Sequence, residues 1–204
     1  AIPDDFEPYI CGIIGEGAAA SPNEVLGWIG SLSELQPTKG YWLCSEIDMY
    51  YNWDACSCSG SLSRITTDDI KINSEYFNQS TKQAFYFIED IENIEIGDWI
   101  LAYNGDNVIG ARQWTGSIID VPVMGADGSD YTKGYIETGV VPSFKILRGG
   151  KLINLEGDIP AFENNQLYMV SSLIGAVALP ETFSLDRAYP NPFNPTTTLS
   201  FAIP

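Results

Sequence analysis

Apolar and polar residues alternate along most of the chain between residues 70 and 173. A period of two is typical of β-strands that have one buried face. The pattern predicts strands at 84–88, 99–103, 108–114, 135–137, 143–147, 152–155 and 166–170, with Gly, Asn, Asp or Pro between nearly every pair. Short strands at this spacing, without a helical period, predict an all-β fold: an antiparallel β-sandwich, immunoglobulin-like or jelly-roll-like.

A β-hairpin over residues 96–114 is the clearest element of this pattern. Trp99 and Tyr103 lie on the same side of its first strand, and Trp114 ends its second strand. Residues 104–107 read Asn-Gly-Asp-Asn, a sequence that readily adopts the left-handed conformation of a tight turn. Because the turn fixes the register of the two strands, we expect the tryptophans to lie in a core.

The first third of the chain predicts a small β module stapled by disulfides. Short strands are expected around Trp28 and Trp42, on either side of a turn at residues 37–40. The predicted organisation is a cysteine-containing module at 1–64, a central sandwich at 65–176, and a linker with a few strands at 177–204. The chain begins at Ala1 with no leader sequence before it, so we expect a mature chain whose signal peptide has been removed.

The cysteine count indicates an oxidising compartment. All four cysteines lie in the first third of the chain, and an even, clustered count predicts two disulfides. The last two are separated by one residue and are poorly placed to pair with each other, so we expect each to reach one of the first two. A zinc site of four thiolates is the alternative, although no C-x-x-C pair is present. The residues concerned are Cys11, Cys44, Cys56 and Cys58.

The charge balance disfavours whole classes of partner. The chain has 27 acidic and 10 basic residues, a net charge of −17, and no histidine. Such a chain repels nucleic acids and anionic membranes, and no apolar run is long enough to span a membrane, so we expect neither nucleic-acid binding nor membrane insertion. Without histidine the commonest general base is missing, and we predict that the protein is not an enzyme.

A pair of carboxylates could still act on a sugar. Asp98 and Asp106, with Arg112 nearby, are the candidates on the central hairpin, and the aromatic residues Trp99, Tyr103 and Trp114 would stack against the substrate. The same aromatic residues favour carbohydrate binding without catalysis as a second hypothesis. The purely structural interpretation is that the aromatic residues are buried and that Asp106 is a turn-forming residue.

An oxygen-rich stretch at residues 120–137 is the candidate calcium site. Asp127, Ser129, Asp130 and Glu137 offer the hard oxygen ligands that calcium prefers, although their spacing is not that of an EF-hand. An Asp-Gly-Ser turn with solvated carboxylates explains the same residues without a metal.

Three sets of motifs resemble known families. The sequence at 14–19, 27–32 and 37–42, which ends in Gly-Tyr-Trp, resembles small modules that recur in large secreted proteins of marine bacteria. Those modules normally begin one strand earlier, so we expect that strand to be missing. The sequence at 77–80, 97–99, 104–106, 110–112 and 122–131 resembles a domain found beside them. The sequence at 183–201, with Tyr-Pro-Asn-Pro-Phe-Asn-Pro, is similar to the opening strands of the C-terminal sorting domain recognised by the type IX secretion system.

The sorting-domain resemblance implies export through the outer membrane by the secretion machinery, and a location outside the cell or on its surface. The sequence ends in a strand, 197–204, with no evident partner in its own chain. An open strand edge is readily paired by a neighbouring molecule, and head-to-tail donation repeats without closing. We therefore predict a non-catalytic structural or interaction protein, the subunit of a surface filament; the alternative is a carbohydrate-binding module of a secreted polysaccharide-degrading protein. The predicted assembly residues are Thr197, Leu199, Phe201 and Ile203.

Overall fold

The computed structural model describes residues 2, 6–36, 39–50, 76–175, 184–185, 187–189, 191–192 and 195–202. It confirms the all-β prediction, since β-strands dominate and the only helices described are two short 3-10 turns, η1 (Glu7–Tyr9) and η2 (Asp130–Thr132). Among these residues no helix is long and apolar enough to cross a membrane.

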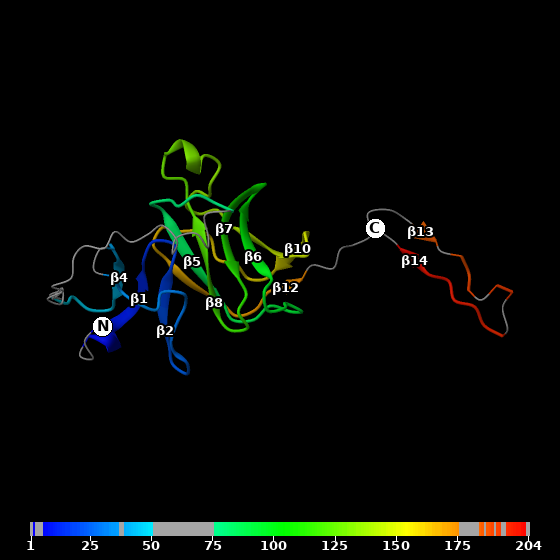
Figure 1. Cartoon of the computed structure of the whole chain (residues 1–204), viewed down its shortest axis with the longest axis horizontal. Coiled ribbons are helices and arrows are strands. Elements are labelled where there is room, and N and C mark those ends of the chain that lie inside the picture. Colours follow the sequence, from blue (N-terminus) through cyan, green and yellow to red (C-terminus); the bar gives the residue numbers. More distant parts are fainter. Residues whose placement is uncertain are drawn as a thin grey trace, which may run out of the picture.

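The N-terminal strands form a four-stranded antiparallel sheet with the order β3-β2-β1-β4 (Figure 1). The expected strands around Trp28 and Trp42 are both present, but each pairs with an earlier strand, so they lie at opposite edges of the sheet. The strands are β1 (Ile10–Ile14), β2 (Ala19–Asn23), β3 (Gly27–Ile29) and β4 (Trp42–Ser45).

The central residues form the two sheets of a sandwich. One sheet has five strands in the order β12-β10-β9-β6-β7, and the other has three in the order β11-β5-β8. The five-stranded sheet contains β6 (Trp99–Asn104), β7 (Asn107–Gln113), β9 (Ser143–Arg148), β10 (Lys151–Glu156) and β12 (Ile174–Gly175). The three-stranded sheet contains β5 (Gln83–Ile88), β8 (Ile119–Met124) and β11 (Leu167–Val170).

One pairing departs from the antiparallel prediction. β11 runs parallel to β5, with Leu167 opposite Phe85 and Val170 opposite Ile88. A parallel pair needs a long crossover, and here β6 to β10 all lie between the two strands in the chain. The predicted strand at 135–137 is absent: only Ile136 makes an isolated bridge, to Gly125.

β8 was not predicted as a strand, and Pro122 explains why. Proline has no N–H to donate to a strand ladder and is tolerated mainly at sheet edges. β8 is an edge strand of its sheet, and Pro122 lies opposite Phe85 of β5. At this edge the two sheets approach closely, because a Cβ atom built on Gly110 of β7 would lie 1.6 Å from the carbonyl oxygen of Pro122. Only glycine fits at position 110.

The central hairpin is confirmed. β6 and β7 pair with Asn104 opposite Asn107, and Gly105 in the turn between them has a φ of +58°. Trp114 is buried in the core, while Trp99 is half-buried and packs against Tyr76 with 5.1 Å between the ring centres.

β5 is buried on both faces and makes the molecule three layers thick. Tyr86 and its alternate neighbours pack into the main core between the sandwich sheets, where its ring lies 5.4 Å from that of Phe144. Phe85 and Phe87 point the other way and form a second core with residues of the N-terminal sheet, among them Ile14 and Ala19. The N-terminal sheet therefore packs on the sandwich as a third layer, as Figure 1 shows at the left of the sandwich.

The expected disulfide pairing is wrong for Cys11 and Cys44, which are bonded to each other. The reason is strand adjacency: β1 and β4 are neighbours, and the Cα atoms of the two cysteines are 5.2 Å apart. Cys56 and Cys58 lie outside the described residues. The disulfide confirms that a covalent staple holds the N-terminal sheet.

Candidate functional site

The predicted carboxylate pair on the hairpin does not exist. Asp98 immediately precedes β6 and Asp106 lies in the turn after it, so a six-residue strand, roughly 20 Å long, separates them. Asp98 instead forms an ion pair with Arg148, whose Nε atom lies 3.0 Å from both carboxylate oxygens. The hydrogen bonds from Arg148 hold the pKa of Asp98 below its usual value. Asp98 is thus a buried ion-pair partner, and Asp106 is an exposed turn residue.

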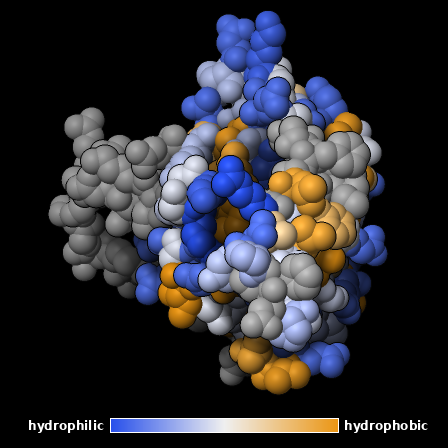
Figure 2. Space-filling model, turned by 90° about the vertical axis from the view of Figure 1, so that its right-hand side faces the viewer, coloured by the Kyte–Doolittle hydropathy of each residue, from blue (hydrophilic) through white to orange (hydrophobic). Residues whose placement is uncertain are grey.

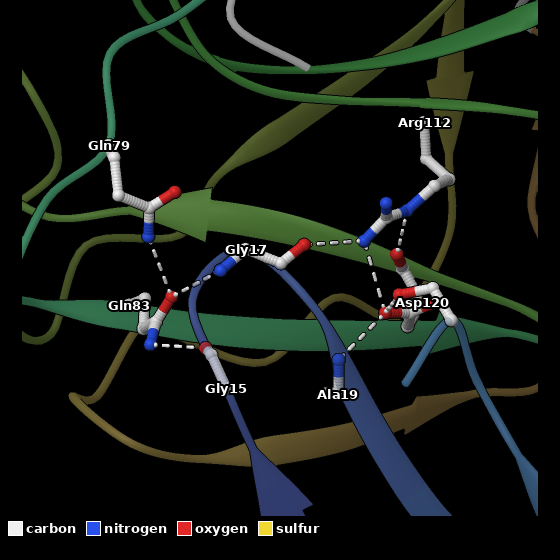
Figure 3. Close-up of polar contacts among 8 residues, drawn as sticks. Gly15, Gly17, Ala19, Gln79, Gln83, Arg112 and Asp120 are labelled. Carbon is white, nitrogen blue, oxygen red and sulfur yellow. Dashed lines mark hydrogen bonds and ion pairs between the residues drawn. The ribbon is translucent and has the colours of Figure 1, made fainter. Parts of the chain in front are cut away.

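Arg112, the third residue of that group, belongs to a buried junction between the N-terminal sheet and the sandwich (Figure 3). Its guanidinium Nη2 donates to the Asp120 carboxylate at 3.1 Å and to the carbonyl oxygen of Gly17 at 2.9 Å. The same carboxylate of Asp120 accepts hydrogen bonds from the Ala19 N–H at 3.2 Å and from the Ser31 hydroxyl at 2.6 Å. One carboxylate on β8 therefore binds two segments of the N-terminal sheet and a cation on β7.

Gln83 of β5 completes the junction from the other side. Its side-chain amide donates to the Gly15 carbonyl oxygen at 2.9 Å, and its oxygen accepts from the Gly17 N–H at 3.4 Å and from Gln79 at 3.0 Å. The turn between β1 and β2 is held from both ends, as the dashed lines in Figure 3 show. Gly17 has a φ of +67°, so the turn also depends on glycine.

The junction is structural in character. Asp120 is 1% exposed, and burial raises the pKa of its carboxyl, while the positive charge of Arg112 and the hydrogen bonds from Ser31 and Ala19 act in the opposite direction. Burying a polar group costs free energy unless the group is hydrogen-bonded. In this junction the polar groups of two layers form hydrogen bonds with each other. The sequence signal for this site is the presence of Asp120 and Gln83 within otherwise apolar segments, and neither residue was predicted as part of a site.

The hairpin aromatics do not form a platform for sugar rings. Trp114 and Tyr103 are buried in the main core, and Trp99 packs against it. Lys145 lies over the ring of Tyr103, with its Nζ atom 4.4 Å from the ring centre, so a cation already contacts this ring. The hairpin therefore supplies core packing rather than a stacking surface.

The oxygen-rich loop is closed by hydrogen bonds centred on Asp127. Its carboxylate accepts hydrogen bonds from the Ser129 N–H at 3.0 Å, from the Thr132 hydroxyl at 2.7 Å and from the Thr81 N–H at 3.1 Å. The Ser129 hydroxyl also donates to this carboxylate, at 2.5 Å, and the hydrogen bonds to Asp127, that of the Ser129 hydroxyl first, lower its pKa. Asp130 and Glu137 are exposed. Within the described residues no three His, Cys, Asp or Glu side chains are grouped to hold a metal; calcium binding stays a prediction, and the contacts favour the plain turn.

The predicted final strand has a partner in its own chain, contrary to expectation. β14 (Phe201–Ala202) pairs antiparallel with β13 (Ser184–Leu185), and Tyr189 bridges Thr198 between them. The partner lies a short way back along the chain, so a local hairpin satisfies one edge of the strand. We call the described residues of 184–202 the tail hairpin. In Figure 1 it stands apart from the three layers, in orange and red.

The tail hairpin exposes large apolar side chains along its length. The exposed fractions are 73% for Leu185, 80% for Tyr189, 58% for Leu199 and 68% for Phe201. Two-stranded hairpins alone are marginally stable in water, and their outer edges offer unpaired N–H and C=O groups. Of the predicted assembly residues, Thr197, Leu199 and Phe201 are exposed, and Ile203 lies outside the described residues.

Figure 2 views the molecule from the side of the tail. Hydrophobic residues lie at the surface there, interspersed among hydrophilic ones. In comparisons with protein-family models, curated proteins and solved structures, nothing matches this chain.

Proposed function

We propose that this protein is a non-catalytic, extracellular structural protein that self-associates through its tail hairpin, as the subunit of a head-to-tail assembly at the cell surface. The observation that carries the proposal is the tail hairpin itself, a two-stranded element with exposed apolar side chains. Burying that surface against a second copy removes apolar area from water, and this is the dominant driving force of most protein association.

The rest of the molecule is suited to a durable role outside the cell. A disulfide ties β1 to β4, and a buried polar junction ties the N-terminal sheet to the sandwich. Disulfides persist in oxidising compartments. The resemblance of residues 183–201 to a sorting domain supports export independently. The high negative charge opposes nonspecific aggregation, so self-association requires a defined contact whose apolar burial offsets the repulsion between copies.

The first test is the assembly state of the whole chain. Size-exclusion chromatography with light scattering, beside negative-stain electron microscopy, is expected to show a ladder of multimers or fibres. The double variant Leu199→Asp and Phe201→Asp replaces two apolar side chains of the tail with charged ones and is expected to give folded monomers. Leu152→Asp is the matched control, because Leu152 is a similarly exposed leucine, at 50%, on the sandwich. It should assemble as the unmodified protein does.

Deletion of residues 196–204 should have the same effect as the double variant. Circular dichroism and thermal melting check that the sandwich is intact, which we expect because no described residue of the tail belongs to either core. An unmodified chain that stays monomeric at high concentration, or a deletion variant that assembles at full strength, contradicts the proposal.

A further inference from the structure

A groove lies on the outer face of the N-terminal sheet, away from the sandwich. Its volume is about 780 Å³, within the range of roughly 300–1,000 Å³ that is usual for binding clefts. Ile13 and Ala20 form its floor, and Trp28, Leu32 and Leu35 line its sides. None of these residues has a part in the junction or the main core.

Strand alternation explains why the floor is apolar. Ile14 and Ala19 point into the second core against β5, so their neighbours Ile13 and Ala20 point to the opposite face. Ile13 and Ala20 are opposite each other in the pairing of β1 with β2, which joins them into one apolar strip. Each is only 4% exposed, so the apolar area still open in the groove belongs mainly to the partly buried side chains of Trp28, Leu32 and Leu35.

The walls are held in position by hydrogen bonds. The N–H of Leu32 donates to the carbonyl oxygen of Ala19 at 3.0 Å, which anchors the segment 32–35 beside the sheet. On the other side the indole N–H of Trp28 donates to the carboxylate of Glu7. A groove with anchored walls stays open instead of collapsing onto its apolar floor.

The charges at the groove narrow the choice of occupant. Glu7 and Glu34, both exposed, are the charged residues among those that line it, so an acidic occupant would be repelled. The whole chain has a net charge of −17, but residues 177–204 contain only the charged residues Glu181, Asp186 and Arg187 and have a net charge of −1. Arg187 is exposed, beside the apolar residues of the tail hairpin.

We propose that this groove receives the tail hairpin of a second copy of the chain. The inference rests on the proposed function and names the acceptor for it: apolar side chains of the tail pack between Trp28, Leu32 and Leu35, and Arg187 lies near Glu34 and Glu7. β12, the last described element before the tail, lies on the opposite side of the sandwich from β1 and β2 (Figure 1). A donor at one end and an acceptor at the other make a heterologous contact, which repeats into an open chain.

The test is complementation between two variants of the full-length protein. Leu35→Asp damages the groove and keeps the tail, whereas deletion of 196–204 removes part of the tail and keeps the groove. Each variant alone is expected to be monomeric. Mixed in equal amounts, they should form a one-to-one heterodimer that grows no further, because only one intact groove and one intact tail remain. Light scattering measures the mass of the product.

A charge reversal at an exposed position gives a second, milder variant that leaves the apolar packing unchanged. Glu34→Lys should weaken self-association a few-fold, as expected for a partly solvated charge pair. Adding Arg187→Glu to the same chain should restore the affinity, measured by sedimentation at several concentrations. Glu24→Lys, at an exposed position in the tip between β2 and β3, changes the net charge equally and is the control.

The outcomes separate the two proposals. If Leu35→Asp and Glu34→Lys assemble as the unmodified chain does while the tail variants do not, the groove is not the acceptor and the role of the tail stands. If the tail variants assemble normally, the proposed function fails and the acceptor fails with it. A Leu35→Asp chain that is unfolded by circular dichroism leaves the decision to the charge-reversal pair.

Discussion

The buried carboxylate of Asp120 offers the sharpest test of how the layers are joined. Replacing it with alanine removes the acceptor for the Ala19 N–H, the Ser31 hydroxyl and one guanidinium nitrogen of Arg112. Ala19 is fully buried, so its N–H cannot form a replacement hydrogen bond with water. Arg112, whose side chain is 12% exposed, loses its counter-charge.

The magnitude follows from these contacts. Breaking a buried ion pair by removing one partner costs about 3–5 kcal/mol. Two effects move the expected value to the lower end. Arg112 keeps its hydrogen bonds to the carbonyl oxygens of Gly17 and of residue 120 itself, at 2.9 and 2.8 Å. Burial also raises the pKa of Asp120, which means that ionising this carboxyl in the folded protein is costly, and the variant no longer bears that cost. We expect a loss of about 3 kcal/mol.

Urea denaturation followed by tryptophan fluorescence measures this loss. With a slope of about 2–3 kcal/mol per molar, the midpoint should fall by roughly 1–1.5 M. Glu16→Ala is the control, because the ion pair of Glu16 with Lys39 is at the surface, with side chains 54% and 30% exposed. Such pairs contribute about 1 kcal/mol or less. Asp120→Asn, which retains one acceptor oxygen, should lie between the two. An Asp120→Ala midpoint indistinguishable from that of the control would refute the role assigned to the junction.

Two further predictions concern packing and pH. Gly110→Ala should destabilise the sandwich by at least about 1–3 kcal/mol, because the added methyl group would overlap the carbonyl oxygen of Pro122. Gly40→Ala is the control: nothing lies within 4 Å of the added atom, so its stability in the same urea assay should be close to that of the unmodified protein. Arg148 lowers the pKa of Asp98 in the folded protein, so this pair contributes stability above the unfolded pKa, near 4, and loses it as the pH falls through the folded pKa. Asp98→Asn should therefore be less stable than the unmodified protein at pH 7 and approach it as the pH falls toward 2; a gap that is constant from pH 7 to 2 would contradict the assignment.

The local elements of this protein follow closely from its sequence. The hairpin of β6 and β7 was predictable because Asn-Gly-Asp-Asn fixes the turn and the turn fixes the register. The remaining predicted strands, apart from the one at 135–137, appear within a residue or two of their expected bounds, because a two-residue period depends only on neighbouring side chains. β8 was not predicted because a proline such as Pro122 is tolerated only in an edge strand. Whether a strand lies at an edge is decided by how the whole sheet assembles, which the local sequence does not show.

The arrangement of layers depends on information that no local pattern contains. The run 84–88 is apolar at every position, which fits a strand buried on both faces, but which sheet covers each face depends on residues up to about a hundred positions away. The pairing of Cys11 with Cys44 likewise depends on β1 and β4 being neighbours, and spacing alone allowed three pairings.

The candidate sites divide in the same way. The sequence by itself determined the class of fold, the absence of histidine and the acidic surface, and it drew attention to the apolar tail. Only the tertiary structure decided that Asp98 binds Arg148, that Asp120 binds Arg112, and that the tail carries its own strand partner. The physical reason is range: alternation and turn chemistry act over a few residues, whereas a buried charge finds its partner wherever the packed layers bring one within hydrogen-bond distance.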